Sequence, residues 1–124
     1  MTSRPLFTLP PLAKIARNAL GAHARDELQA TSSRHAGKGA HYYDPGTKCC
    51  CVIGASIPPK LAMALDRQEY PAIVDLLDAG TVVAYGPVRD QLRYLQRLHD
   101  SVLLCDPSGD KKRRLLDYLR DLAR

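Results

Sequence analysis

The sequence predicts a mainly α-helical α+β fold, with about five helices and a small antiparallel β-hairpin in one compact domain. Apolar residues recur at helical spacing in several stretches, and a turn signal at residues 44–47 separates two runs with β propensity. The chain of 124 residues has the length of one domain. We therefore expect one domain over residues 1–124, with residues 1–7 as a candidate disordered end and residues 31–40 as a mobile loop.

The first helix is expected over residues 8–21, where "TLPPLAKIARNALG" carries one apolar stripe. Thr8 is a candidate cap, and Gly21 is a candidate end because glycine often terminates helices. Residues 22–30 have the composition to continue as a second, polar helical piece. The stripe consists of Leu12, Ile15, Ala16, Ala19 and Leu20.

A β-hairpin is expected over residues 41–53, "HYYDPGTKCCCVI". If residues 48–53 form one strand, successive side chains alternate between its two faces. The three consecutive cysteines would then be divided between those faces. One face would carry Cys49, Cys51 and Ile53, and the other would carry Cys50 and Val52.

The second half of the chain alternates between helices and breaks. We expect helices over residues 57–66, beginning near two prolines, and 69–80, ending at a glycine. Residues 81–85 predict a short extended piece. The strongest helix pattern covers residues 88–104, and a last helix runs from Asp110 to the end. Because only a short turn joins these last two helices, we expect an antiparallel pair.

The formal net charge is +5, and it is unevenly distributed. Residues 1–48 carry seven Lys or Arg against three Asp or Glu, residues 49–107 five against seven, and residues 108–124 six against three. Basic ends favour docking on an acidic partner, either nucleic acid or protein, although basic tails on a soluble protein give the same pattern. No stretch reaches about 18 apolar residues, so we expect no membrane partner and a cytoplasmic location with reduced thiols.

His99 and Cys51 raise the question of thiol chemistry. On a helical wheel, His99 falls among the apolar residues and points inward. It is then either a core histidine bonded to a backbone carbonyl or the base that activates Cys51 as a nucleophile. Asp100 lies on the flank, where it is placed to pair with Arg97 or Arg93 and not to orient the imidazole.

Zinc binding is a further alternative for the cysteines. Cys49 and Cys51 are spaced to present two thiolates on one strand face, and Cys105, His99 and His41 would complete the ligand set. The chain has no C-x-x-C pair, however, and free cysteine is commonly buried as a small hydrophobe. We therefore expect no cofactor, with zinc bound by Cys49, Cys51, His99 and Cys105 as the alternative.

The last helix opens with a basic cluster. Residues 111–114 place four positive charges at a helix N-terminus, against the helix dipole, and a bound phosphate or carboxylate would reverse the sign of that effect. The alternative is a solvated face held by ion pairs, with Arg113–Asp117 and Asp121–Arg124 as candidates. The predicted partner-binding and anion-binding residues are Lys111, Lys112, Arg113, Arg114, Arg120 and Arg124.

Three segments, "CVIGASIPP", "LDAG" and "LQRLHD", follow one another in the chain. In this order they resemble a group of small uncharacterised phage, prophage and proteobacterial proteins that share C-x-I-G before a proline-started helix and a later L-Q-x-x-H-D. The resemblance covers about residues 40–100. Cys49 and Cys50 lie outside the shared pattern, which moves any shared role to Cys51. The matching positions are Cys51, Ile53, Gly54, Leu95, Gln96, His99 and Asp100.

The resemblance implies a small accessory protein of a phage or mobile element, a class that includes inhibitors of host defence such as anti-CRISPR proteins. We therefore expect a non-enzymatic protein of the host bacterial cytoplasm that binds a host protein or nucleoprotein complex through charged surfaces. One alternative is a cysteine-dependent enzyme with Cys51 as nucleophile and His99 as base. Another is a nucleic-acid-binding module that uses the basic last helix.

Overall fold

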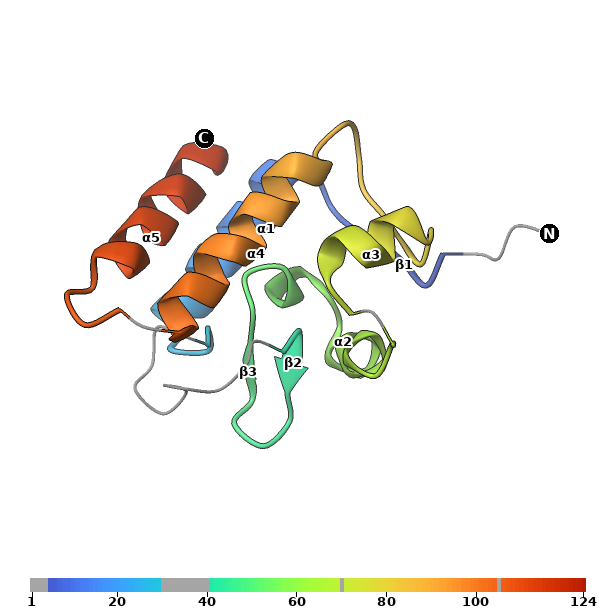
Figure 1. Cartoon of the computed structure of the whole chain (residues 1–124), viewed down its shortest axis with the longest axis horizontal. Helices are drawn as coiled ribbons and strands as arrows, with labels where there is room; N and C mark the ends of the chain where they lie inside the picture. Colours follow the sequence, from blue (N-terminus) through green and yellow to red (C-terminus); the bar gives the residue numbers. More distant parts are fainter. Residues whose placement is uncertain (1–4, 30–40, 70, 105) are drawn as a thin grey trace.

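The computed structural model describes residues 5–29, 41–69, 71–104 and 106–124. Within them, five α-helices and two small sheets confirm the prediction of a mainly α-helical fold with a small antiparallel hairpin (Figure 1). The helices are α1 (Leu12–Ala24), α2 (Pro59–Asp66), α3 (Ile73–Asp78), α4 (Arg89–Leu104) and α5 (Asp110–Leu122). In this described part of the chain, no helix has both the length and the apolar character needed to cross a bilayer.

Two short sheets pair segments of the chain. β2 and β3 are antiparallel neighbours, as the hairpin prediction requires. β1 and β4 pair in parallel, although they are far apart in the sequence. Because Thr8 lies in β1, it does not cap the first helix, which begins after Pro11. The strands are β1 (Phe7–Thr8), β2 (Tyr43–Asp44), β3 (Cys49–Cys50) and β4 (Val82–Val83).

Other predicted boundaries differ from the structure. The strand predicted over residues 48–53 is too long, because β3 ends at Cys50 and the chain then turns into a 3-10 helix, η2 (Gly54–Ser56). Helix α1 continues through Gly21, since a glycine inside a helix costs only about 1 kcal/mol and the packing of α1 on α5 outweighs it. Residues 31–40, the predicted mobile loop, lie outside the described residues.

The segment after α1 is also not the second helical piece that its composition suggested. Arg25 and Asp26 form a turn, and Leu28 then makes an isolated parallel bridge to Cys50. Near the N-terminus, Phe7 lies in β1, although residues 1–7 were a candidate disordered end. These short pairings tie the N-terminal part of the chain to both sheets.

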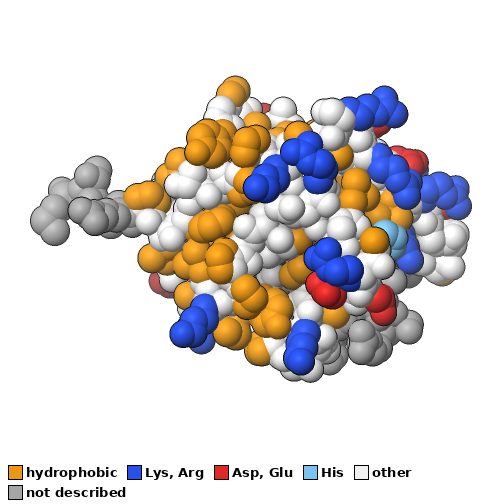
Figure 2. All heavy atoms as spheres, turned by 180° about the vertical axis from the view of Figure 1, so that it is seen from behind, with side chains coloured by type: hydrophobic (Ala, Val, Ile, Leu, Met, Phe, Trp, Pro, Cys, Tyr) orange, Lys and Arg blue, Asp and Glu red, His pale blue; other side chains and the backbone are white. Residues whose placement is uncertain are grey.

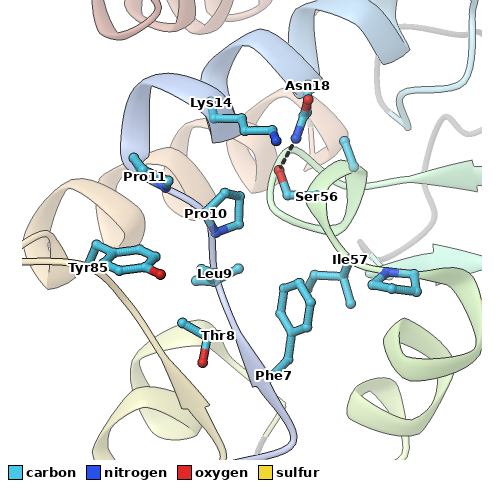
Figure 3. A pocket seen from close by; sticks show the side chains of 12 residues that line it. Phe7, Thr8, Leu9, Pro10, Pro11, Lys14, Asn18, Ser56, Ile57 and Tyr85 are labelled. Carbon is cyan, nitrogen blue, oxygen red and sulfur yellow. Dashed lines mark hydrogen bonds between the residues drawn. The ribbon is translucent and has the colours of Figure 1, made fainter.

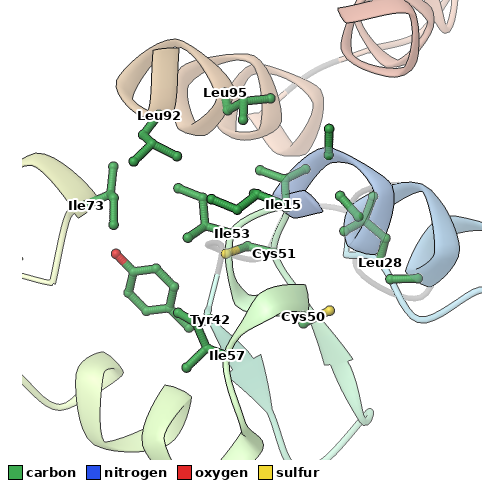
Figure 4. Close-up of a cluster of buried hydrophobic side chains, with 14 of the residues drawn as sticks. Ile15, Leu28, Tyr42, Cys50, Cys51, Ile53, Ile57, Ile73, Leu92 and Leu95 are labelled. Atoms are coloured by element: carbon green, nitrogen blue, oxygen red, sulfur yellow. The ribbon is translucent and has the colours of Figure 1, made fainter. Parts of the chain in front are cut away.

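Helices α1, α4 and α5 lie together in one half of the molecule, and α2, α3 and the hairpin lie in the other (Figure 1). α4 and α5 run antiparallel, as predicted, and the rings of Tyr94 and Tyr118 meet edge to face with centroids 4.9 Å apart. Figure 4 shows part of the core between the two halves. Its largest fully buried side chains are Leu9, Ile15, Leu28, Ile53, Leu65, Ile73, Leu92, Leu95, Leu115, Leu119 and His99.

Candidate functional site: the Cys51–His99 interior and the basic α1–α5 face

The imidazole of His99 is buried on the inner side of α4 and is hydrogen-bonded at both nitrogens. Nε2 lies 2.6 Å from the carbonyl oxygen of Gln29, and Nδ1 lies 3.3 Å from the backbone nitrogen of Val52. Because the Val52 N–H can only donate, Nδ1 accepts and Nε2 carries the proton that goes to Gln29. Burial lowers the pKa of His99 to about 4, so the ring is neutral near pH 7. The predicted inward orientation is confirmed, and the ring connects three segments of the chain.

Cys51 opens a tight turn whose geometry depends on Gly54. The Cys51 Sγ accepts a hydrogen bond from the backbone N–H of Gly54 at 3.2 Å, and burial raises the pKa of the thiol to about 12. A side chain at Gly54 would place its Cβ 1.9 Å from the carbonyl oxygen of Tyr42. Only glycine allows the two backbones to approach so closely. The C-x-I-G segment is therefore a packing element.

The structure does not join Cys51 and His99 into a nucleophile and base. Among the described residues, no hydrogen bond connects the two side chains, because the imidazole nitrogens are both bonded to main-chain groups. A nucleophilic cysteine needs an adjacent base or a lowered thiol pKa. Cys51 has neither feature, since burial raises its pKa. The geometry favours the core-histidine interpretation.

Cys49 and Cys50 are also buried, and they hold the hairpin against the segment after α1. The Cys50 N–H donates to the Glu27 carbonyl at 2.9 Å, and the Cys50 carbonyl accepts from the Gln29 N–H at 2.8 Å. The Cys49 thiol lies 3.8 Å from the carbonyl oxygen of Asp26, and burial raises the pKa of Cys50 to about 12. The strand ends at Cys50, so the predicted alternation does not extend to Cys51, and all three side chains are buried.

The candidate zinc ligands do not form a metal site in the part of the chain that the structure describes. No group of three or more His, Cys, Asp or Glu side chains is placed there to hold a metal ion. His99 has both nitrogens engaged, and the Cys51 sulfur faces the Gly54 N–H. Cys105 lies outside the described residues. The residues that are described do not fit tetrahedral zinc.

A cavity of about 290 Å³ brings together three positions of the C-x-I-G and L-Q-x-x-H-D pattern, Cys51, Gln96 and Asp100. Two of its polar side chains already serve the fold. The Gln96 Oε1 accepts the N–H of Ile73 at 3.0 Å, and the Asp66 carboxylate accepts the N–H groups of Tyr42 and Tyr43, where the chain enters β2. The shared pattern thus marks a hydrogen-bonded junction between α4, the hairpin and α3.

Asp100 is the exception in this cavity. Contrary to the prediction, the described residues show no ion pair from Asp100 to Arg97 or Arg93. Partial burial raises the pKa of its carboxyl group. Cys51 and Asp66 line the same cavity, but Asp66 accepts main-chain N–H groups and burial raises the pKa of the Cys51 thiol, so the group is not arranged as a nucleophile and base.

The N-terminus of α5 already holds an anion, the carboxylate of Asp106. Its two oxygens accept the backbone N–H groups of Lys111 and Lys112, each at 3.0 Å. This internal carboxylate occupies the N–H donors that we expected to bind an external anion. Its negative charge also offsets the unfavourable interaction between the basic cluster and the positive end of the helix dipole. The side chains of Lys111 and Lys112 are half-buried, whereas Arg113 and Arg114 are exposed.

Cations of α1 and α5 share one side of the molecule (Figure 2). Arg17 donates from Nη1 to the carbonyl oxygen of Ala123 at 3.3 Å, where a cation suits the end of the helix dipole. At the far end of α1, burial and the nearby charges of Lys112 and Arg120 lower the pKa of His23. The basic α1–α5 face, as the name is used below, consists of Arg17, Lys112, Arg120 and Arg124, together with Arg113, which falls between Arg120 and Arg124 on the helical wheel of α5.

Four of the six predicted partner-binding residues lie on this face, and two do not. Lys111 is seven residues before Tyr118, so it lies on the side of α5 that packs on α4. Arg114 lies about 160° around the helix from Lys112, whose charge acts on His23 of α1, so it points away from α1. Sequence reasoning missed Arg17, because its contact with the end of α5 spans 106 positions and leaves no local pattern.

Carboxylates of α5 lie among these arginines. The pairs are Arg113–Asp110 at 3.4 Å, Arg120–Asp117 at 3.3 Å and Arg124–Asp121 at 3.6 Å. The predicted Asp121–Arg124 pair is confirmed, while Arg113 pairs with Asp110 and not with Asp117. All six side chains are more than half exposed, and such pairs contribute about 0–1 kcal/mol each. The arginines therefore stay available to a partner.

Comparisons of this chain with protein-family models, with curated protein sequences and with solved structures find no match. The resemblance to phage and proteobacterial proteins, and the activity that it implies, therefore stay predictions. A function for this chain has to be argued from the geometry of its interior and of its charged surface.

Proposed function

We propose that this protein is a non-catalytic binding protein that docks on an acidic protein surface through the basic α1–α5 face. The observation that carries the proposal is the grouping of cations from two helices, far apart in the chain, on one side of the molecule. The side chains that suggested catalysis, Cys51 and His99, are instead buried and bonded to the main chain. The proposal therefore assigns binding, and not catalysis, to the charged surface.

An acidic protein fits this face better than nucleic acid does. The carboxylates Asp110, Asp117 and Asp121 alternate with the arginines, and they would repel a continuous phosphate backbone. A protein surface carries both signs of charge and can complement such a mixed pattern. Aromatic residues make up only 6% of the chain and Trp is absent, so few side chains can stack on nucleobases.

The biological setting of the proposal rests on the resemblance. Small accessory proteins of phages and mobile elements, among them anti-CRISPR proteins, are the class that it implies. Within this proposal, the chain occupies a charged surface of a host protein or nucleoprotein complex and inhibits it by blocking that surface. Neither a cofactor nor a reaction is required for this role.

The test is affinity capture from a nuclease-treated proteobacterial lysate with two variants of equal net charge. One variant combines Arg17→Gln, Arg120→Gln and Arg124→Gln. The control combines Lys48→Gln, Lys60→Gln and Arg67→Gln, all at exposed positions outside the face. We expect the face variant to lose acidic captured proteins by about tenfold or more, and the control to retain them, as quantified by mass spectrometry.

Two outcomes would overturn the proposal. Equal losses in both variants would show that net charge alone, and not the face, governs binding. Capture by the wild-type chain from an untreated lysate but not from the nuclease-treated one, with its direct binding to DNA or RNA, would replace the proposal with the nucleic-acid alternative.

A further inference from the structure

A groove of about 660 Å³ opens where the chain enters α1 (Figure 3). Its walls come from β1 and the two prolines after it, from η2 and the residues that follow, and from Tyr85 (Figure 3). Polar and apolar atoms share its exposed lining about equally, and Phe7, Pro10, Pro11 and Pro58 contribute to the apolar part. The volume lies in the range of about 300–1,000 Å³ that is typical of ligand pockets.

Exposed apolar side chains concentrate around this groove. Leu6, just before β1, is 50% exposed, and Tyr85 on the wall is 61% exposed. Val83 is 40% exposed in β4, directly beside β1. Exposed apolar residues scattered singly are common, but three of them in and next to the strands that border one groove favour a binding site there.

The groove is held in shape by polar contacts and carries one positive charge. The Asn18 side-chain nitrogen donates to the Ser56 hydroxyl at 2.9 Å, which fastens α1 to η2 (Figure 3). Lys14 is the charged side chain among the lining residues, and no carboxylate lines the groove. Its preferred occupant is therefore apolar with a negative charge close by.

The groove is continuous with the basic α1–α5 face. Lys14 lines the groove and is three residues before Arg17, so the two side chains are neighbours on the surface of α1. Arg17 in turn reaches Ala123 at the end of α5. Figure 2 shows hydrophobic side chains gathered toward the β1 side of this view and many Lys and Arg side chains toward α5.

We propose that the groove binds an apolar side chain of an extended, acidic protein segment, whose carboxylates contact Lys14 and Arg17. This inference rests on the proposed function and names the kind of acidic partner it requires. The adjoining basic α1–α5 face carries carboxylates that would repel a phosphate backbone, and the groove offers proline and aliphatic side chains for apolar contact, so a protein segment is the occupant that these surroundings favour.

The test uses two fluorescein-labelled polyglutamate peptides that differ only at a central residue, leucine in one and glycine in the other. We expect the leucine peptide to bind the wild-type chain about tenfold more tightly in fluorescence anisotropy, because the groove buries its side chain. Tyr85→Ser should abolish this preference. Tyr94→Ser is the control, since Tyr94 is exposed on α4 outside the groove, and it should keep the preference.

The possible failures are distinguishable. Equal binding of the two peptides would overturn the groove proposal and leave the proposed function standing. Binding of neither peptide would overturn both. A dimer of the chain in sedimentation that Tyr85→Ser dissociates would overturn the acidic-segment proposal and assign the groove to a second copy.

Discussion

The interior around Cys51 and His99 and the basic α1–α5 face both contain residue types that suggest function, but their side chains are satisfied to different degrees. In the interior, both imidazole nitrogens and the Cys51 sulfur have main-chain partners and are shielded from water. On the face, the arginines make exposed pairs worth about 0–1 kcal/mol each. Buried groups whose hydrogen bonds are complete stabilise the fold, whereas exposed and weakly paired charges can exchange their partners for those of another molecule.

The largest expected effect is at Gly54. Gly54→Ala should lower the free energy of unfolding by about 3 kcal/mol or more, because the new Cβ would lie 1.9 Å from the Tyr42 carbonyl oxygen. Gly80→Ala is the matched control, since its φ of +75° strains an alanine but its Cβ would meet open space. That variant should lose about 1–2 kcal/mol. Equal losses in urea unfolding would contradict the close approach at Gly54.

The next effect is at His99. His99→Leu leaves the Val52 N–H and the Gln29 carbonyl without partners, which should reduce stability by about 2–4 kcal/mol. Gln96→Leu on the same helix removes its half-buried bonds to the Ile73 N–H and to the Tyr42 side chain, and should cost about 1–2 kcal/mol. Chemical denaturation followed by circular dichroism measures both, and an unchanged stability in His99→Leu would refute the connecting role of the ring.

The same histidine predicts a dependence of stability on pH. Its pKa is about 6.5 in the unfolded chain and is lowered to about 4 by burial in the folded protein. Between these values the unfolded chain binds the extra proton, so stability is fully present above about pH 6.5 and decreases as the pH falls toward 4, by up to about 1.4 kcal/mol per pH unit. The pKa of His23 is also lowered, by burial and by the charges of Lys112 and Arg120, so the comparison is between wild type and His99→Leu, which should lack the His99 component.

The last prediction concerns the reactivity of Cys51 and leaves stability unchanged. Iodoacetamide at pH 7.5 should modify Cys51 in the folded protein at least about a hundredfold more slowly than in urea, because burial raises the pKa of the thiol to about 12 and blocks access. Tandem mass spectrometry of the peptide that contains residues 49–51 locates the label. Rapid labelling of Cys51 in the native protein would revive the thiol-enzyme hypothesis.

Much of the fold could be predicted because its signals are local. The helical spacing of apolar residues located α4 and α5, the turn at residues 44–47 located the hairpin, and the wheel placed His99 inside. The pairing of β1 with β4 could not be found in this way, since each strand has two residues and the pairing depends on tertiary contacts.

The candidate site was less predictable for related reasons. The side chains of adjacent cysteines alternate between two faces only where the backbone is extended. The turn that leads to Gly54 ends the extended segment after Cys50. Asp106 was visible in the sequence as an acidic residue before a helix, a known capping signal, but the basic cluster drew the interpretation toward an external anion. Asp100 had helical spacing to Arg97, yet exposed pairs are too weak to be fixed by spacing alone.

The central claim is that binding resides on the basic α1–α5 face and not in the Cys51–His99 interior. Capture from the nuclease-treated lysate tests it directly when two folded variants are compared, Cys51→Ala and the triple variant Arg17→Gln, Arg120→Gln and Arg124→Gln. The account predicts that the triple variant loses the captured acidic proteins by about tenfold or more while Cys51→Ala retains them. Loss of capture in Cys51→Ala, with retention in the triple variant, would contradict it.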